Sequence, residues 1–432
     1  DYKFRFQSGN VVAAIVDGTQ AEKIDVIGGE VVGNLKLRLL HGSPRTGWGS
    51  LKQALESGNP VSGGETTTKD MCILFFTSGT TGPPKMVAHT HAYPRALSEV
   101  GSTWLDLKED DVHWNISDTG WAKAAWSSLF GPWSQGAAVF VQQPGPKFDA
   151  KATLETLHSH PITTICAPPT VYRGLVAHPS LSSLRPSRLR HAVAAGEPLN
   201  ATIIEGWEAA TGVKVHDGYG QTETTLLVAN IPGKKIRPGS MGRAMNDYDI
   251  QVLGDDLQPV KTDAEGDLAV RCRPHRPLGL FQEYLDNPAE MQDKFRGDWY
   301  LTGDRATKDA DGYLWFVGRS DDVILSSGYR IGPFEVESCL LEHAAVLESA
   351  VVASPDPRAY EIVKAFVVLK PGFTPSPALA AQLQDHVKHT TAPYKYPREV
   401  EFVAELPKTV SGKIRRVDLR KAEYERKAGR QD

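Results

Sequence analysis

Hydrophobic runs of five or six residues recur through the first half of the chain, and longer stretches of mixed, helix-like pattern separate them. Buried strands that alternate with helices, joined by loops rich in Gly and Pro, are typical of an α/β fold in which helices cover parallel strands. We therefore expect doubly wound parallel sheets in a large N-terminal domain. The runs that predict these strands are 11–16, 35–40, 71–76, 137–141, 163–167 and 189–194.

The pattern changes near residue 250, where the predicted strands become shorter. Turn-forming pairs such as Gly254-Asp255 and Asp311-Gly312 separate them. Paired strands of this kind form antiparallel hairpins. We expect a small β-barrel-like subdomain over about residues 250–320, with strands at 249–253, 267–271 and 313–317.

A third pattern follows Asp321. It contains two predicted helices and two predicted strands, which lie at 333–342, 346–353, 362–369 and 378–389. Elements in this order predict a compact α+β domain at the C-terminus. The large domain then takes residues 1–320 and the C-terminal domain residues 321–432.

Composition and charge exclude several classes of protein. The chain has 432 residues, of which 41% are hydrophobic, so it can build several domains with real cores. The formal net charge of −4 excludes the global positive field that a nucleic-acid binder uses. The cysteines lie too far apart for a zinc site or a disulfide framework, which suits a reducing compartment; they are Cys72, Cys166, Cys272 and Cys339. We expect an intracellular location, in the cytoplasm or the mitochondrial matrix.

Residues 121–141 form the longest weakly charged stretch of the chain. Lys123, Pro132 and Gln135 interrupt it, so it falls short of the ~20 apolar residues that a membrane span needs. We expect a buried helix followed by a strand there. The chain begins with Asp-Tyr-Lys and enters a hydrophobic run almost at once, so we expect that the true N-terminus is missing.

Residues 77–85 read Thr-Ser-Gly-Thr-Thr-Gly-Pro-Pro-Lys and directly follow a predicted strand. Small hydroxyl residues and glycines let backbone N–H groups and Oγ atoms close around phosphate oxygens, and a lysine adds a positive charge. In a Walker A loop a Ser or Thr follows the lysine, whereas here Met86 follows Lys85 and only two residues separate Gly79 from Gly82. The run therefore predicts a phosphate-binding loop and disfavours a P-loop NTPase.

A second run, Asp-Gly-Tyr-Gly-Gln-Thr-Glu, spans 217–223. Tyr219 can stack on a purine, and Glu223 offers the oxygen ligand that Mg2+ prefers. Gly196-Glu197-Pro198 is weaker, because such a triplet alone is more often a plain turn. Three shorter segments each pair a turn with charge: Tyr-Leu-Thr-Gly-Asp at 300–304, Gly-Arg-Ser-Asp-Asp at 318–322 and Pro-Lys-Thr-Val-Ser-Gly-Lys at 407–413.

In this order, these segments resemble the adenylate-forming superfamily of acyl-CoA synthetases, luciferases and peptide-synthetase adenylation domains. Residues 117–121, 326–333 and 391–398 are similar to the medium-chain acyl-CoA synthetase family in particular, and the resemblance covers essentially the whole chain. It implies a large AMP-binding domain, N-terminally incomplete here, and a small mobile C-terminal domain that turns about a hinge at Asp321.

The resemblance also implies the reaction. A carboxylic acid attacks the α-phosphate of ATP to give an acyl-AMP and pyrophosphate, and the thiol of CoA then displaces AMP. ATP, Mg2+ and CoA are the expected cofactors and substrates. We expect no nucleic-acid partner and no transmembrane segment, and the sequence does not predict the oligomeric state. Residues 388–432 carry 12 basic and 7 acidic side chains, which is either a solvated face or a surface for the phosphates of CoA.

Individual roles carry over by position. The catalytic set is Thr80, Glu223, Arg330 and Lys413, in which Glu223 binds Mg2+ and Lys413 reaches the α-phosphate. Asp304 takes the ribose hydroxyls, and Arg319 contacts ribose or phosphate. The phosphates of ATP are held by Thr77, Ser78, Gly79, Thr80, Thr81, Gly82, Pro83, Pro84 and Lys85. Adenine and the acyl-adenylate are cradled by Gly196, Glu197, Pro198, Asp217, Gly218, Tyr219, Gly220, Gln221 and Thr222. CoA faces Ser327, Gly328, Tyr329, Lys388, Tyr396, Pro397 and Arg398.

The acyl pocket is expected around Gly220 and Thr222. Acetyl-CoA synthetases carry a bulky Trp where this chain has Gly220, so the resemblance implies a pocket open to a medium-chain fatty acid or a benzoate-like acid. Trp121, Trp126 and Tyr172 are candidate walls, and for each of them a place in an aromatic core is an equally good interpretation.

Two alternatives to an acid:CoA ligase stay open. One is a truncated, non-catalytic remnant that binds nucleotide or acyl groups. The other is an adenylation enzyme that loads a carrier protein, although the chain has no Ser-containing carrier segment and its basic stretch suits CoA. The chain also departs from the family after Ser-Pro-Asp-Pro, where Arg358-Ala-Tyr360-Glu replaces Arg-Gly-Glu and leaves one CoA contact unassigned.

Overall fold

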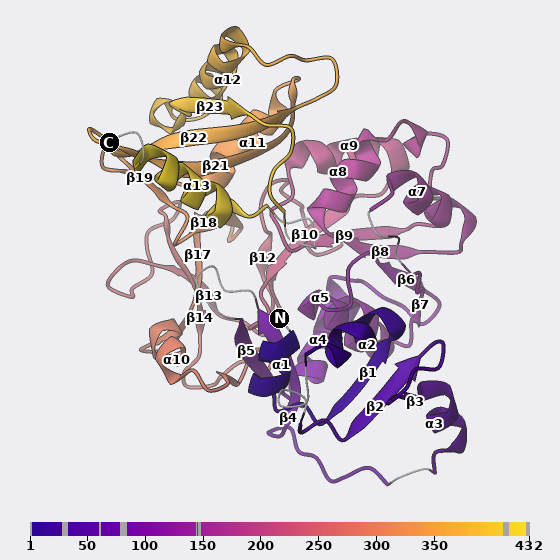
Figure 1. Cartoon of the computed structure of the whole chain (residues 1–432). Helices are drawn as coiled ribbons and strands as arrows, with labels where there is room; N and C mark the ends of the chain where they lie inside the picture. Colours follow the sequence, from indigo (N-terminus) through magenta and orange to yellow (C-terminus); the bar gives the residue numbers. More distant parts are fainter. Residues whose placement is uncertain are drawn as a thin grey trace. The chain divides into compact units, whose positions relative to one another are not determined.

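A computed structural model describes residues 2–27, 33–59, 62–77, 84–143, 145, 148–408 and 414–428 (Figure 1). The chain forms two units, one of residues 1–70 and 76–86, the other of residues 71–75 and 87–432. Two strands carry the chain from one unit to the other, namely β4 (Met71–Thr77) and β5 (Lys85–Thr90).

The smaller unit is built on a parallel sheet in the order β1-β2-β3, with a core of Phe6, Ala14 and Ile24. Asp17 and Ser50 begin its second and third helices, because each side chain accepts a hydrogen bond from a backbone N–H three residues on. The predicted strands are confirmed, displaced by one or two residues. The elements are α1 (Tyr2–Ser8), β1 (Ala13–Asp17), α2 (Gly18–Asp25), β2 (Leu37–His41), β3 (Gly49–Ser50) and α3 (Leu51–Ser57).

The larger unit contains a long sheet in the order β12-β11-β10-β9-β8-β6-β7. From β7 to β10 the neighbouring strands are parallel, while β11 and β12 join antiparallel at one edge. The α/β prediction is confirmed, with this antiparallel edge as an addition. The strands are β6 (Val112–Asn115), β7 (Ala138–Val139), β8 (Thr164–Ala167), β9 (His191–Ala195), β10 (Val215–Gly220), β11 (Leu226–Ala229) and β12 (Arg243–Ala244).

Both faces of this sheet are buried. Successive residues of a strand point to opposite faces, and Ile165 and Cys166 of β8 enter different hydrophobic cores. On the Ile165 face lie α7 (Ala150–Ser159), α8 (Pro169–Ala177) and α9 (Ala201–Thr211), and on the Cys166 face lies α4 (Tyr93–Thr103) (Figure 1). Helices on both faces make the doubly wound arrangement that the sequence predicts.

The weakly charged stretch 121–141 forms a helical run and then a strand, as predicted. Helix α5 (Ala122–Ala124) continues into the π-helical turn η1 (Ala125–Phe130) and α6 (Gly131–Ser134), and β7 follows. π-helical turns occur often at functional sites. Within the described residues, no helix of the chain has both the length and the apolar character needed to cross a membrane.

The β-rich region is antiparallel throughout, which confirms the predicted hairpins. Its sheet runs β13-β14-β17-β16, and β18 also pairs with β17. Tyr284 and its neighbour Glu283 pair instead with β5. The elements are β13 (Ile250–Leu253), β14 (Gly266–Arg271), β15 (Glu283–Tyr284), α10 (Pro288–Lys294), β16 (Phe295–Arg296), β17 (Trp299–Lys308) and β18 (Leu314–Arg319).

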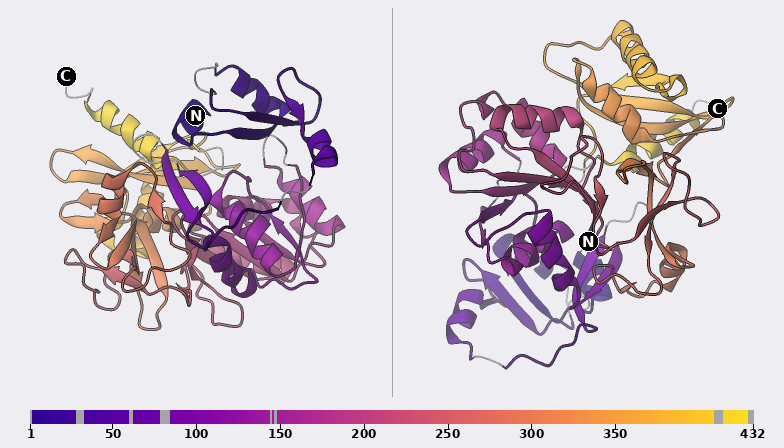
Figure 2. Two further views of the ribbon diagram at one scale, coloured as in Figure 1. Left: turned by 90° about the horizontal axis from the view of Figure 1, so that it is seen from below. Right: turned by 180° about the vertical axis from the view of Figure 1, so that it is seen from behind.

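The C-terminal elements, orange to yellow in Figures 1 and 2, form an α+β body around a sheet in the order β20-β19-β22-β21, with β23 beside β22. Val351 packs with α11 and α12 on one face of β21, and Val352 packs near α13 on the other. Helix α11 has the predicted bounds. The elements are β19 (Ile324–Ser326), β20 (Tyr329–Ile331), α11 (Pro333–Glu342), β21 (Val346–Asp356), β22 (Tyr360–Leu369), α12 (Pro377–Thr390), β23 (Glu399–Phe402) and α13 (Arg416–Ala428).

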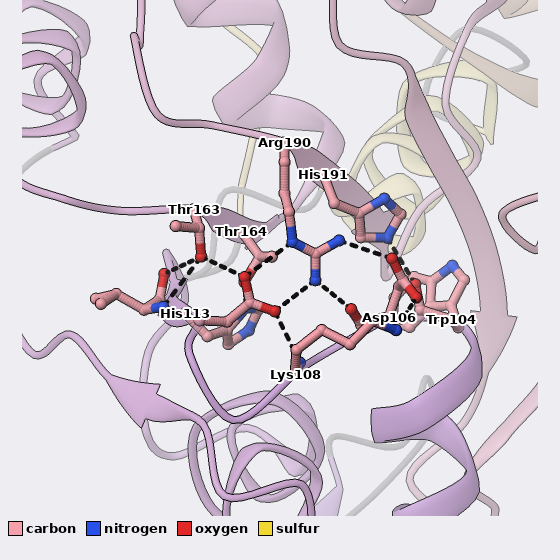
Figure 3. A network of polar contacts seen from close by, with 10 residues as sticks. Trp104, Asp106, Lys108, His113, Thr163, Thr164, Arg190 and His191 are labelled. Atoms are coloured by element: carbon pink, nitrogen blue, oxygen red, sulfur yellow. Dashed lines mark hydrogen bonds and ion pairs between the residues drawn. The ribbon is translucent and has the colours of Figure 1, made fainter.

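A polar network fastens the amino-terminal ends of the parallel strands (Figure 3). Arg190, just before β9, donates from Nε to Asp111 Oδ1 at 2.9 Å and from Nη1 to Asp106 Oδ2 at 2.7 Å. Thr163, just before β8, donates to Asp111 Oδ1 at 2.7 Å. Burial raises the pKa of Asp111, but hydrogen bonds from Arg190 and Thr163 bring it below the ordinary value. β6, β8 and β9 are thus joined at this end.

Candidate active site

Two of the sequence motifs lie at the opposite, carboxyl ends of strands of this sheet. Gly196 follows β9, and Gly218 of β10 pairs with Ala195, the last residue of β9. Gly196 has a φ of +112°, which favours glycine. In open α/β sheets, ligands bind outside the carboxyl ends of the strands. The structure therefore brings 196–198 and 217–223 to the edge of the sheet where a ligand is expected.

Asp304 of β17 joins these motifs to a third. Tyr219 donates its hydroxyl proton to Asp304 Oδ2 at 2.5 Å, and Gln221 Nε2 donates to the same oxygen at 2.9 Å. Arg319 of β18 pairs in register with Asp304. Burial first, and then the charge of Asp304, raise the pKa of Tyr219, so its phenol stays a hydrogen-bond donor. Four residues with predicted nucleotide contacts thus lie together.

Asp217 points inward. The residue is 4% exposed, and its side-chain oxygens accept from the backbone N–H of Leu199 at 3.4 Å and of Gly218 at 3.0 Å. Burial raises the pKa of this carboxyl well above its ordinary value. Asp217 therefore ties the 196–199 turn to β10, and its predicted contact with nucleotide stays a prediction.

Glu223 is held by both its backbone and its side chain. Its carbonyl accepts from Phe281 N at 2.8 Å, and its Oε1 accepts from the Tyr284 hydroxyl at 2.9 Å. The described residues contain no cluster of three or more metal-ligating side chains. A single carboxylate fits Mg2+, which proteins commonly hold through one or two carboxylates together with substrate phosphates.

The acyl-pocket candidates divide into two groups. An ideal Cβ on Gly220 would lie 2.8 Å from Trp126 Cη2, so these residues touch. Trp126 is 4% exposed and donates from Nε1 to the Tyr93 hydroxyl at 2.6 Å, whereas Trp121 is 38% exposed. Tyr172 lies elsewhere, in the core on the other face of the sheet, where its ring meets Trp207. This placement favours the core interpretation of Tyr172.

Some predicted nucleotide contacts cannot be placed. Ser78, Gly79, Thr80, Thr81, Gly82 and Pro83 lie outside the described residues, and so does Lys413. Thr77 is the last residue of β4, Pro84 follows the undescribed stretch, and Lys85 begins β5. The phosphate-loop and lysine roles therefore stay predictions.

The predicted CoA residues lie on the C-terminal body in two groups. Ser327 and Gly328 form the turn between β19 and β20, with φ of 51° and 84°, as a two-residue hairpin turn requires. Beside it, Tyr329 stacks on Tyr394 with ring centroids 4.2 Å apart, and Arg330 is exposed.

In the second group two cations meet one ring. Lys388 Nζ lies 4.5 Å and Arg398 Cζ 4.2 Å from the centroid of Tyr396, and Arg398 also donates to the Tyr396 hydroxyl. Pro397, which lies between Tyr396 and Arg398 in the sequence, is buried. Positive groups beside an aromatic face suit an anionic nucleotide.

The hinge candidate is held from both sides. Arg319 Nε donates to Asp321 Oδ1 at 2.8 Å. Arg420 of α13 donates to the Asp321 carbonyl at 2.7 Å and to Asp322 Oδ1 at 2.9 Å. The role of Asp321 as a hinge and the domain boundary beside it stay predictions.

Comparison with known families now decides the class. Residues 3–285 match the AMP-binding enzyme family, and residues 335–413 match the AMP-binding enzyme C-terminal domain. The chain belongs to the AMP-binding enzymes.

Its relatives place this AMP-binding enzyme among medium-chain acyl-CoA synthetases. The mouse protein named acyl-coenzyme A synthetase ACSM3, mitochondrial, is 49% identical over 429 residues, which cover 98% of this chain and 73% of the relative. The human acyl-coenzyme A synthetase ACSM5, mitochondrial, is 47% identical over 98% of the chain and 73% of its own length.

Solved structures agree on the fold. The anthranilate CoA ligase AuaEII, in complex with anthranoyl-AMP, is 33% identical with a TM-score of 0.90 over 99% of this chain and 81% of its own. The benzoate CoA ligase of Burkholderia xenovorans is 28% identical, with a TM-score of 0.84 over 97% of this chain and 81% of its own. The resemblance and the fold class are confirmed.

The structure adds residues of the AMP-binding enzyme that sequence reasoning missed. Tyr300 and Thr302 lie inside the 300–304 motif, so the motif itself could have pointed to them. Lys123, which lies between Trp121 and Trp126 in the sequence, donates from Nζ to Ala195 O at 2.9 Å. His89 Nε2 donates to Thr222 O at 2.7 Å; burial lowers the pKa of His89 to about 4, so its ring is neutral. Tyr284 had no local signal.

Proposed function

We propose that this chain joins a medium-chain fatty acid or a benzoate-like acid to CoA, through an acyl-adenylate. In the first step a carboxylate oxygen attacks the α-phosphorus of ATP, and the bond to the β-phosphate oxygen breaks to release pyrophosphate. In the second step the thiolate sulfur of CoA attacks the acyl carbon, and AMP leaves with the electron pair of the broken C–O bond. The observation that carries the proposal is the joining of Tyr219, Gln221 and Asp304 at the carboxyl ends of the parallel strands.

The residues at this edge suit adenylation. The Asp304 carboxylate can accept ribose hydroxyls, and Arg319 beside it can donate to ribose or phosphate. We assign the phosphates to residues 77–85, the α-phosphate to Lys413, and the adenylate cradle to 196–198 and 217–222. Mg2+ held at Glu223 would supply charge neutralisation during phosphoryl transfer.

The size of the acid is set, in this proposal, by Trp126. Gly220 has no side chain, but the Trp126 ring occupies the space beside it, since a Cβ there would lie 2.8 Å from Cη2. A smaller apolar residue at 126 would lengthen the pocket. We expect Trp126→Leu to shift preference toward longer acids, because each accommodated methylene changes transition-state binding by about 1 to 3 kcal/mol.

The C-terminal body is proposed to turn about Asp321 between the two steps. Lys413 serves adenylation, and the turn at Ser327 and Gly328 then enters with CoA. Proline fixes φ near −65° and restricts the preceding residue, so Asp321→Pro should still release pyrophosphate once yet discharge acyl-AMP far more slowly. Discharge at the parent rate would place the hinge elsewhere.

The relatives favour the ligase over both alternatives, because their names describe CoA synthetases and CoA ligases. The curated relatives are also named as mitochondrial. We therefore propose a mitochondrial location, which fractionation of a C-terminally tagged protein against a matrix marker would test.

A panel of acids tests the function. Pyrophosphate release is measured with hexanoate, octanoate, benzoate and acetate, first without CoA and then with it. We expect release that needs acid, followed by AMP and acyl-CoA once CoA is added. ATP binding without release from any acid would favour the non-catalytic remnant. Release with no CoA-dependent AMP would favour a carrier-loading enzyme.

A further inference from the structure

Two buried tyrosines donate hydrogen bonds to residues of the 217–223 motif, one to Glu223 itself and one to Gln221, which bonds to Asp304. Tyr284 donates to Glu223 Oε1 at 2.9 Å. Tyr300 donates to Gln221 Oε1 at 3.1 Å, and Gln221 donates to Asp304 Oδ2 at 2.9 Å. Both tyrosine rings also pack against the ring of Phe281. The tyrosines that support the predicted metal ligand and the predicted ribose ligand thus share one packing partner.

Both tyrosines are fixed in place by packing. Tyr284 is 2% and Tyr300 1% exposed. The Phe281 ring lies 4.6 Å from the first and 5.6 Å from the second, measured between centroids. Strand pairing adds to this, because Tyr284 is in register with Val87 of β5. A hydroxyl on such a ring has little freedom, and so it can orient its acceptor.

A glutamate side chain needs such support to act as a ligand. Its three rotatable bonds leave the carboxylate free to turn, and groups that bond to a ligand's outer side restrict it and tune its metal affinity. The Tyr284 hydroxyl supplies such a group, because it donates to Glu223 Oε1 at 2.9 Å. The Phe281 N–H holds the backbone of the same glutamate.

We propose that Tyr284 is a positioning residue for Glu223, and that Tyr300, which packs on the same Phe281 ring, holds Gln221 beside Asp304, so that metal and ribose are received by one preorganised unit. The inference rests on the proposed function, which assigns Mg2+ to Glu223. It adds two residues from β15 and β17, outside the 217–223 motif, to the machinery of the site.

The test measures binding, without turnover. A non-hydrolysable ATP analogue is titrated calorimetrically into the full chain at increasing Mg2+. We expect Tyr284→Phe to need about 10-fold more Mg2+ for half-maximal binding, since loss of a group behind a metal ligand commonly costs 10 to 100-fold in metal affinity. Analogue binding without Mg2+ should match the parent. Tyr248→Phe is the matched control, because that tyrosine is also buried and its hydroxyl bonds to Thr225 instead.

A double-mutant cycle separates positioning from general packing. If Tyr284 acts through Glu223, adding Tyr284→Phe to Glu223→Gln should change the Mg2+ requirement no further. Additive effects would overturn the inference, as would a Tyr284→Phe chain that matches the parent in Mg2+ requirement. If Tyr284→Phe fails to fold, the cycle is run with Tyr284→Met, which also lacks the hydroxyl, so additivity has the same meaning. A parent that binds no analogue at any Mg2+ would overturn the proposed function together with this inference.

Discussion

The two ends of the large parallel sheet are built in opposite ways. At the amino-terminal ends Arg190, Asp106 and Asp111 bond to one another and to neighbouring protein groups (Figure 3). At the carboxyl ends glycines replace side chains, and polar groups from β10 and β17 converge on Asp304. The first end holds strands together, whereas the second leaves backbone open to a ligand. We therefore expect substitutions at the amino-terminal ends of the strands to change stability, and substitutions at the carboxyl ends to change catalysis.

The strongest way to break this comparison is to remove Arg190. Arg190→Met leaves Asp111, whose side chain is 3% exposed, without its cation. We expect the free energy of unfolding to fall by about 3 to 5 kcal/mol, because an unpaired buried charge is costly. Denaturant unfolding measures this. In the control Arg271→Met, the partner Asp249 is 45% exposed, so about 0 to 1 kcal/mol is expected. Equal losses would contradict a special role for the amino-terminal network.

At the other end, Lys413→Ala should affect one half-reaction alone. We expect adenylation to fall about 100 to 1,000-fold, since a charge that stabilises the transition state acts only where charge develops. Thioester formation from supplied acyl-AMP should continue. Pyrophosphate release and CoA-dependent AMP release are measured separately, with Lys408→Ala as control. Equal loss of both half-reactions would remove Lys413 from its assigned role.

The amino-terminal end also predicts a dependence on pH. Burial first, and then the neighbouring His216, lower the pKa of His191 to about 4, and its Nε2 donates to Trp104 O at 2.7 Å. Below about pH 6.5 the unfolded chain binds a proton that the folded chain does not. The free energy of unfolding should therefore be constant above about pH 6.5 and fall toward pH 4, by roughly 3 kcal/mol for this group.

The variant His191→Asn tests this dependence. Unfolding measured across pH 7 to 4 should show a shallower fall in His191→Asn than in the parent, while the exposed His275→Asn should follow the parent. A parent whose stability does not change over this range would mean that His191 titrates alike in both states.

The smallest expected effect sharpens the carboxyl end. A Cβ on Gly220 would lie 2.3 Å from Thr225 O, so Gly220→Ala forces β10 and β11 apart. We expect a loss of about 1 to 3 kcal/mol and weaker use of every acid. Gly63, which has open space around its Cβ position, gives the control Gly63→Ala. An unchanged stability and acid profile in Gly220→Ala would show that the close approach is not required.

The local pattern of the sequence predicts the helices and strands, but it does not predict the contacts between them. Helix α11 has its predicted bounds, because Pro333 and the apolar spacing after it are local signals. The motif at 217–223 was also legible, since small residues and a carboxylate stand close together. By contrast, Tyr284 and Glu223 are 61 positions apart and meet only through the pairing of β15 with β5. Tyr172 shows the same limit, because which face of the sheet a helix covers is decided by topology.

One measurement tests the central claim most directly: the first-turnover release of pyrophosphate per folded chain, compared between Asp304→Asn and Arg190→Met with hexanoate or benzoate as the acid. We expect Arg190→Met, at a temperature where it is folded, to give the parent amplitude, although its free energy of unfolding is lower. Asp304→Asn should keep the parent stability and lose most of the release at limiting ATP. Parent-like release by Asp304→Asn, or a parent chain that releases pyrophosphate without any dependence on acid, would contradict the account.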